Sequence, residues 1–139
     1  MKLLIDTNIV LDVLLKREPF CELSAKVLGL CSRKDIHEYV SASSITDIYY
    51  IARRQMKSKD SARKLLQKLL RIISVAGVTE EDILMALRLD WTDFEDSVQY
   101  AVAVMSGFDG VVTRNPEDFK NAEITVWQPE ALLTALDKL

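Results

Sequence analysis

The chain has 139 residues, of which 49% are hydrophobic and 28% are charged, and its formal net charge is −3. This balance is ordinary for a globular protein, and the length suits a single domain covering residues 1–139. Only four glycines and three prolines are present, which argues against long disordered segments. No apolar run reaches the about 18 residues that a membrane helix needs, and no secretory signal pattern is seen, so we expect a cytoplasmic protein with no membrane partner.

The two cysteines, Cys21 and Cys31, stand on one predicted helix, about 15 Å apart along its axis. That separation is too long for a disulfide and fits a reducing compartment. The one histidine, His37, does not form a zinc motif with such scattered cysteines. A bound metal would therefore depend on oxygen ligands.

The hydrophobic pattern predicts strands that alternate with helices. Residues 2–5 form the first strand, residues 8–16 a short apolar helix that stops before Pro19, and residues 20–33 an amphipathic helix. The other predicted elements are a strand at 38–42, helices at 44–54 and 59–70, a strand at 72–76, a helix from Thr79 to about 89, a helix at 94–106, strands at 110–113 and 123–127, and a final helix from Pro129.

Strands separated by helices are typical of parallel sheets with right-handed crossovers. We therefore predict an α/β fold, a three-layer α/β/α sandwich with a central, mostly parallel sheet. The sequence contains neither GxGxxG nor GxxxxGK[ST], which argues against dinucleotide and P-loop nucleotide sites.

Three acids stand where a strand or a strand-to-helix loop leads into a helix, namely Asp6, Asp47 and Asp96. In a parallel sheet such positions meet at one edge, where ligands usually bind. Carboxylates packed together repel and raise one another's pKa values, and a divalent cation removes that cost. Mg²⁺ and Mn²⁺ prefer hard oxygen ligands and can activate a water for phosphodiester hydrolysis. The pattern favours metal-assisted hydrolysis, with catalysis by two bare carboxylates as an alternative.

Helix capping is the competing role for Asp6. We expect Thr7 or Asn8 to cap the helix that follows, which leaves Asp6 partly redundant for that purpose. Asp12 is the only polar residue between positions 9 and 15. It lies six residues beyond Asp6, and we expect it to be exposed to solvent.

Capping is also an alternative for the other two acids. Asp47 follows Ser44, and Asp96 follows Asp93, by the three residues of a capping box. Glu95 and Asp93 are neighbours of Asp96 and are candidates to support it from outside the site. Helix capping and exposure to solvent are sufficient alternative roles for both.

The segment DGVVTRNPEDF at 109–119 supplies a fourth group of polar residues after a strand. Thr113 offers a hydroxyl, Asn115 a carbonyl oxygen and Asp118 a carboxylate, and Arg114 is a candidate phosphate contact. The alternative is an ordinary turn built from Asn-Pro and acids.

Four segments occur in a characteristic order and spacing: LIDTN, SSITDIYYIARR, DFEDSVQYAVA and VVTRNPEDF. Together they resemble the PIN domain over essentially the whole chain, and within that family the small prokaryotic toxins of the VapC type. The resemblance implies a Mg²⁺- or Mn²⁺-dependent ribonuclease with a cluster of three or four acids.

When the family's catalytic positions are mapped onto this sequence, they fall on Asp6, Asp47, Asp96 and Asn115. The resemblance also implies that the first three are metal ligands. Asp47 is one methylene shorter than the family's usual Glu, and the neutral Asn115 lowers the charge that holds a second ion. By the resemblance, Asn8 and Thr113 match positions that orient the acids, and Asp118 is the substitute for Asn115 if the loop turns differently. Asp93, a neighbour of Asp96, is a further candidate for a supporting role.

The charges along the chain are segregated. Residues 53–71 hold eight Lys and Arg and one acid, whereas residues 80–96 hold seven acids and one base. Arg53 and Arg54, with Arg114, are the candidate contacts to RNA phosphates, which makes affinity fall with salt. The alternative is a solvated helix face. The apolar helix at 8–15 is interpreted as core, with a partner surface as its alternative.

We expect an endoribonuclease that is the toxin of a toxin–antitoxin pair, with RNA as substrate, a small antitoxin as partner and a homodimeric assembly. One alternative is a PIN-like module that binds RNA or protein with little or no nuclease activity. Another is a small-molecule hydrolase or phosphatase, against which the DTN after the first strand counts because it is not the DxD motif of such enzymes.

Overall fold

The computed structural model describes residues 1–119 and 121–137 of the chain. In this part of the chain a five-stranded sheet has the order β3–β2–β1–β4–β5, and every neighbouring pair is parallel. The strands are β1 (Lys2–Ile5), β2 (His37–Ser41), β3 (Ser74–Ala76), β4 (Gly110–Val112) and β5 (Thr125–Trp127). The predicted parallel sheet is therefore confirmed, with β3 and β5 shorter than expected.

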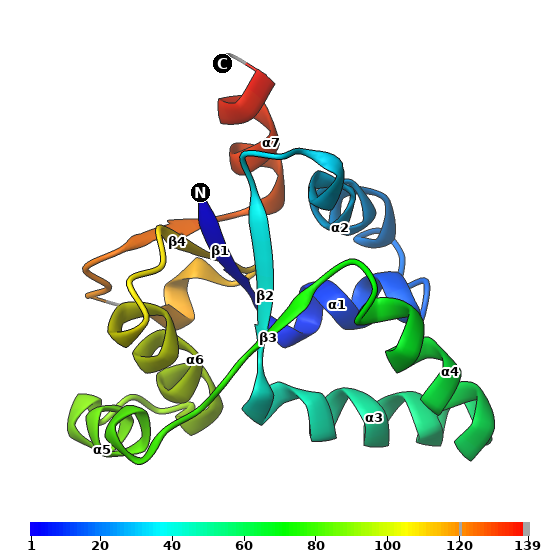
Figure 1. Ribbon diagram of the computed structural model, residues 1–139, viewed down its shortest axis with the longest axis horizontal. Coiled ribbons are helices and arrows are strands. Elements are labelled where there is room, and N and C mark those ends of the chain that lie inside the picture. The colour runs from blue at the N-terminus through cyan, green and yellow to red at the C-terminus, as the bar shows by residue number, and fades with distance from the viewer. Residues whose placement is uncertain (120, 138–139) are drawn as a thin grey trace.

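Helices cover both faces of the sheet and complete the predicted three layers (Figure 1). One layer contains α1 (Thr7–Leu14), α2 (Cys21–Leu28), α3 (Ala42–Met56), α4 (Lys59–Leu69) and α7 (Pro129–Asp137). The other contains α5 (Glu80–Leu89) and α6 (Phe94–Met105), and short 3₁₀ turns occupy Gly29–Ser32 and Pro116–Phe119.

The central strand β1 shows why both faces are covered. Leu3, Leu4 and Ile5 have no exposed surface. Leu3 and Ile5 join the core under the α1 layer, whereas Leu4 joins the core under α6, as the alternation of side chains along a strand requires. An uninterrupted apolar run is typical of a strand buried on both faces.

The strand order creates a crevice between β1 and β4. From β1 the chain proceeds outward to β2 and β3, and it then crosses to β4 on the other side of β1. Ligands of open parallel sheets bind at such a switch point, beyond the carboxyl ends of the strands. Ile5 pairs with Val112, and the Asp6 N–H donates to the Val112 carbonyl at 2.9 Å. Asp6 and Thr113 therefore leave the sheet side by side.

Two predicted helix boundaries were wrong. The helix expected at 44–54 begins at Ala42, because Ser41 is its N-cap and accepts a hydrogen bond from the Ser43 N–H. The proposed capping box of Ser44 and Asp47 is therefore absent. The helix expected at 20–33 ends at Leu28 and continues as a 3₁₀ turn. Within the described residues, no helix combines the length and the apolar character needed to cross a bilayer.

Candidate functional site

A pocket of about 210 Å³ lies at the switch point between β1 and β4. We call it the acid pocket, because six of its lining residues are acidic and none is basic. The acids are Asp6, Asp47, Asp93, Glu95, Asp96 and Asp118, and the other lining residues are Thr7, Asn8, Leu11, Ile51 and Asn115. The structure thus brings together the three principal acids that the sequence singled out, along with Asn115.

Asp6 lines this pocket and accepts a hydrogen bond on each of its carboxylate oxygens. Gln99 Nε2 donates to its Oδ1 at 3.0 Å, and Thr113 Oγ1 donates to its Oδ2 at 2.8 Å. Burial raises the pKa of Asp6, and these two hydrogen bonds oppose the rise. The expected cap from Thr7 or Asn8 was wrong, because Asp6 itself is the N-cap of α1. Its side chain makes no capping hydrogen bond, so the carboxylate is available to the pocket.

Asp96 lies beside Asp6, and the two carboxylates share one hydrogen-bond donor, the side-chain nitrogen of Gln99. Gln99 Nε2, which reaches Asp6, also donates to Asp96 Oδ1 at 3.3 Å. Burial raises the pKa of Asp96 to about 8, and the charge of Asp6 is the next largest cause. Asp93 caps α6, as expected, since its Oδ1 accepts from the Asp96 N–H at 3.1 Å.

Glu95 is part of the pocket rather than a solvated neighbour of Asp96. Thr7 Oγ1 donates to Glu95 Oε1 at 2.8 Å. Burial raises the pKa of Glu95, and the nearby Asp47 on α3 raises it further. Asp47 itself is exposed. The second predicted acid therefore stands at the rim of the acid pocket, whereas Asp6 and Asp96 are buried.

The segment after β4 closes another side of the pocket. The Asn115 N–H donates to Thr113 Oγ1 at 3.1 Å, and the Asn115 carbonyl accepts from the Asp118 N–H at 3.0 Å. Thr113 Oγ1 therefore accepts one hydrogen bond, from Asn115, and donates another to Asp6. Asn115 and Asp118 both line the acid pocket, as the sequence predicted.

Arg114 lies away from the acid pocket, in an ion pair with Asp12. Its Nε donates to Asp12 Oδ2 at 2.7 Å and its Nη2 to Oδ1 at 3.2 Å. The guanidinium carbon also lies 3.8 Å from the centroid of the Phe20 ring. Asp12 has no exposed surface, so its predicted exposure was wrong. The partner that makes its burial possible stands 102 residues further along the chain.

Gln99 is the residue that the sequence reasoning missed. Its side chain is fully buried, and its Oε1 has no hydrogen-bond partner in the described part of the chain. A usable signal was present, because Gln99 follows Asp96 by three residues and therefore shares its helix face.

The acid pocket suits a divalent cation in donor type and charge. All its acidic groups are hard oxygen donors, and their uncompensated repulsion is the kind of cost that a cation removes. In residues 1–119 and 121–137, no group of three or more His, Cys, Asp and Glu side chains is arranged so that it could hold a metal ion. Mg²⁺ retains several waters and often binds through only one or two carboxylates. Asp6 and Asp96 provide such a pair of carboxylates.

Sequence comparison gives one family-level match. The model of the PIN domain matches residues 2–117, which is most of the chain. None of the curated proteins that were compared matches the sequence.

Solved structures with the same fold come from several bacteria. VapBC2 of Rickettsia felis, bound to a DNA fragment from its promoter, has a TM-score of 0.71 and 16% identity, covering 92% of this chain and 98% of that one. A toxin–antitoxin complex from Klebsiella pneumoniae has a TM-score of 0.67 and 18% identity, with coverages of 91% and 96%. VapC20 of Mycobacterium tuberculosis, a toxin that cleaves the sarcin–ricin loop, has a TM-score of 0.63 and 15% identity, with coverages of 78% and 86%.

Proposed function

Because the chain belongs to the PIN-domain family, we propose that it is an endoribonuclease that depends on Mg²⁺ or Mn²⁺. The observation that carries the proposal is the pairing of Asp6 and Asp96 in the acid pocket. Both carboxylates are buried, both accept from Gln99 Nε2, and no basic residue lines the pocket with them. Two buried carboxylates in contact with one donor are costly without a counter-charge.

The proposed metal ligands are the buried pair Asp6 and Asp96. Asp47, which the sequence predicted as a third ligand, stands at the rim, and no three-acid metal arrangement is found among the described residues. Asp47 and Asn115 complete the proposed catalytic set. A bound divalent cation would supply activation of a water and stabilisation of charge on the phosphodiester. In the hydrolysis, the water oxygen bonds to phosphorus and releases a proton to the solvent. The bond from phosphorus to the 3′ oxygen breaks, and that oxygen takes up a proton from the solvent.

The chain's own residues hold these acids in place. Gln99 and Thr113 donate to the two different carboxylate oxygens of Asp6, so this carboxylate has little freedom to turn. Asp93 fixes the first turn of α6 and with it the backbone of Asp96. Asn8 and Asp118 line the same pocket and are proposed to orient the groups around the substrate.

The proposal extends to the setting of the enzyme. The Klebsiella pneumoniae structure is a toxin–antitoxin complex, and the Mycobacterium tuberculosis neighbour is a toxin that cleaves the sarcin–ricin loop. We propose by analogy that this chain is the toxin of such a pair, acting on RNA in the cytoplasm. An antitoxin that covers the acid pocket and a homodimeric assembly belong to the same proposal.

The test is RNA cleavage by the purified full chain with Mn²⁺, and again with a chelator. Cleavage should require the metal and should be lost in Asp6→Asn, with little change in melting temperature. Asp60→Asn, the same change on the exposed surface of α4, is the matched control and should cleave like the parent. Full cleavage by Asp6→Asn would overturn the assignment. RNA binding without any cleavage would instead support the alternative, a PIN-like binding module.

A further inference from the structure

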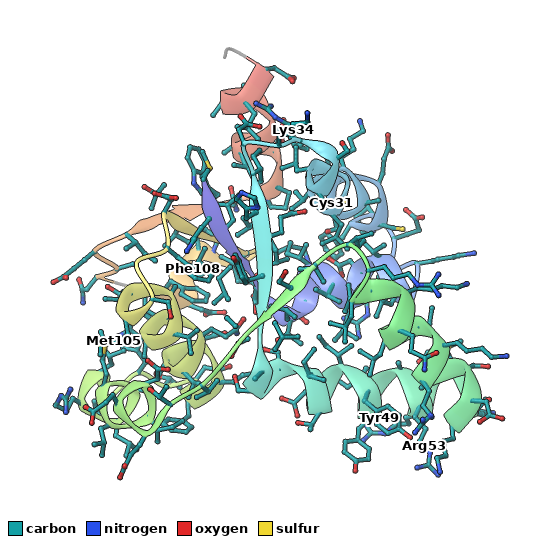
Figure 2. All side chains as sticks on the ribbon, viewed as in Figure 1. Cys31, Lys34, Tyr49, Arg53, Met105 and Phe108 are labelled. Carbon is teal, nitrogen blue, oxygen red and sulfur yellow. The ribbon has the colours of Figure 1, made fainter. Side chains whose placement is uncertain are left out.

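A second pocket, of about 480 Å³, lies at the corner where α3 ends and α4 begins. We call it the basic pocket; it is lined by Tyr50, Arg53, Arg54, Lys57, Ser58 and Lys59. Figure 2 shows Arg53 projecting from the C-terminal half of α3 on the outer side of the molecule. Ser58 caps α4 by accepting from the Ser61 N–H at 3.2 Å, so the positive end of that helix dipole lies at the same corner.

Within the described residues, none of the four cations of the basic pocket takes part in an ion pair. The ion pairs in the described part of the chain are Lys26–Glu22, Arg33–Asp35 and Arg114–Asp12. Asp60 follows Lys59 in the chain but does not line the pocket. Four positive charges gathered beside a helix N-terminus favour an anionic ligand, of which phosphate is the usual case.

The α3 helix connects the basic pocket to the acid pocket. Asp47 and Ile51 line the acid pocket, whereas Arg54, one turn beyond Ile51, lines the basic pocket. Residues seven apart on a helix lie on similar sides, and Asp47 and Arg54 are about 10 Å apart along the axis. A nucleic acid strand carries its phosphates along a chain and is long enough to reach both pockets.

Tyr50 favours a single strand over a duplex or an acidic protein segment. Its side chain is 58% exposed, although it lines a pocket of charged residues. The ring of Tyr49 packs edge-on against it, with centroids 5.1 Å apart, and so limits its orientation. Exposed aromatic rings beside cations are typical of sites that stack the unpaired bases of single-stranded nucleic acids.

We propose that the basic pocket is a subsite for single-stranded RNA, in which the cations bind successive backbone phosphates and Tyr50 stacks on a neighbouring base. The inference rests on the proposed function, because it assigns this subsite to the same strand that enters the acid pocket. The substrate class is therefore an unpaired RNA segment, such as a loop, that extends beyond the cleaved bond.

The first test measures binding without cleavage. Fluorescence anisotropy with a short labelled single-stranded RNA is recorded for the full chain carrying Asp6→Asn, over a range of salt concentrations. Adding Arg54→Ala and Lys57→Ala should weaken binding about tenfold or more. It should also reduce the slope of log K against log salt by about 1.4, the value for two phosphate contacts. Arg63→Ala with Lys68→Ala removes the same charge from exposed positions of α4 and should leave both quantities close to those of the parent.

Equal weakening by the two double variants would overturn the subsite, because it would show only a general charge effect. An oligoglutamate peptide that binds as tightly as the RNA, and through the same residues, would also overturn it in favour of a protein partner. Tyr50→Ala should weaken RNA binding about tenfold with an unchanged salt slope, whereas Tyr50→Phe should bind normally.

Cleavage assays separate this inference from the proposed function. If the parent does not cleave RNA but the binding pattern above is found, the nuclease assignment fails and the subsite stands. If the parent cleaves RNA and the Arg54→Ala, Lys57→Ala variant has an unchanged KM, the subsite fails and the nuclease assignment stands. The expected result is a raised KM with a kcat close to that of the parent.

Discussion

The side-chain amide of Gln99 donates a hydrogen bond to Asp6 Oδ1 at 3.0 Å. The same nitrogen reaches Asp96 at 3.3 Å, so one neutral group holds both buried carboxylates. Because Gln99 lies one turn beyond Asp96 on α6, the helix sets the spacing between Gln99 and Asp96, and the hydrogen bond to Asp6 ties both to the end of β1. This contact holds two carboxyl groups side by side in a pocket that no Lys or Arg of the described residues lines.

We expect Gln99→Leu to impair the metal-dependent reaction while the protein still folds. Leu keeps most of the volume but removes the donor, and loss of such an outer contact typically costs 10–100-fold in metal affinity or activity. The Mn²⁺ concentration for half-maximal cleavage should therefore rise by about that factor. Gln67→Leu, the same change at an exposed position of α4, is the control. An unchanged Mn²⁺ requirement in Gln99→Leu would remove this role.

Thr113→Val should also reduce cleavage. Val has nearly the shape of Thr but has no hydroxyl to donate to Asp6 Oδ2 or to accept from the Asn115 N–H. We expect kcat to fall by about tenfold or more. Thr113→Ser retains the hydroxyl and should recover most of the activity. If Val and Ser variants are equally impaired, the methyl group matters rather than the hydrogen bonds.

Breaking the ion pair between the fully buried Asp12 and the partly buried Arg114 should destabilise the fold around α1. Asp12 also accepts from Ser24 Oγ at 3.1 Å, so it links α1, α2 and the segment after β4. Removing one partner leaves a buried charge unpaired, which costs about 3 kcal/mol or more. We expect Arg114→Leu to lose that amount in urea unfolding. The double variant with Asp12→Leu should lose less than the sum of the two single variants. Strict additivity would contradict this coupling.

The positions of Asp6 and Asp96 in the acid pocket could be predicted because each stands at a strand end or a helix start that is recognisable in the local sequence. In LIDTN, an apolar strand ends at an acid, and the parallel sheet that the alternating elements implied places that acid at the ligand edge. Asp96 was found in the same way, from its place in the first turn of a buried helix. Its partner Asp93 behaves as the capping spacing predicted.

The wrong predictions have long-range causes. Asp12 is the lone polar residue of an apolar helix, and only the folded chain brings Arg114 to it. Likewise, Glu95 becomes part of the acid pocket because Thr7, 88 residues earlier, donates to it. The capping role proposed for Ser44 failed for a local reason, since the preceding Ser41 serves as the cap and starts α3 earlier.

Glu38 on β2 makes stability depend on pH. Its side chain is 4% exposed, and neither carboxylate oxygen has a hydrogen-bond partner within the described residues. Burial raises the pKa of Glu38 from its usual 4.5 to about 8. Between these values the folded state binds a proton that the unfolded state has released. The stabilisation is therefore complete below the unfolded value and is lost as pH rises towards the folded value.

We expect the free energy of unfolding to fall by about 2 kcal/mol more in the parent than in Glu38→Gln between pH 6 and pH 8. Gln has the same size but does not ionise, so the comparison isolates the charge. Urea unfolding at each pH supplies the measurement. Parallel pH profiles for the two proteins would show that Glu38 titrates normally.

Calorimetric titration of Mn²⁺ into the full chain tests the proposed metal site most directly. The parent should bind Mn²⁺, Asp6→Asn and Asp96→Asn should lose that binding, and Asp60→Asn should retain it. No heat of binding in the parent, or undiminished binding in both pocket variants, would contradict the site between Asp6 and Asp96.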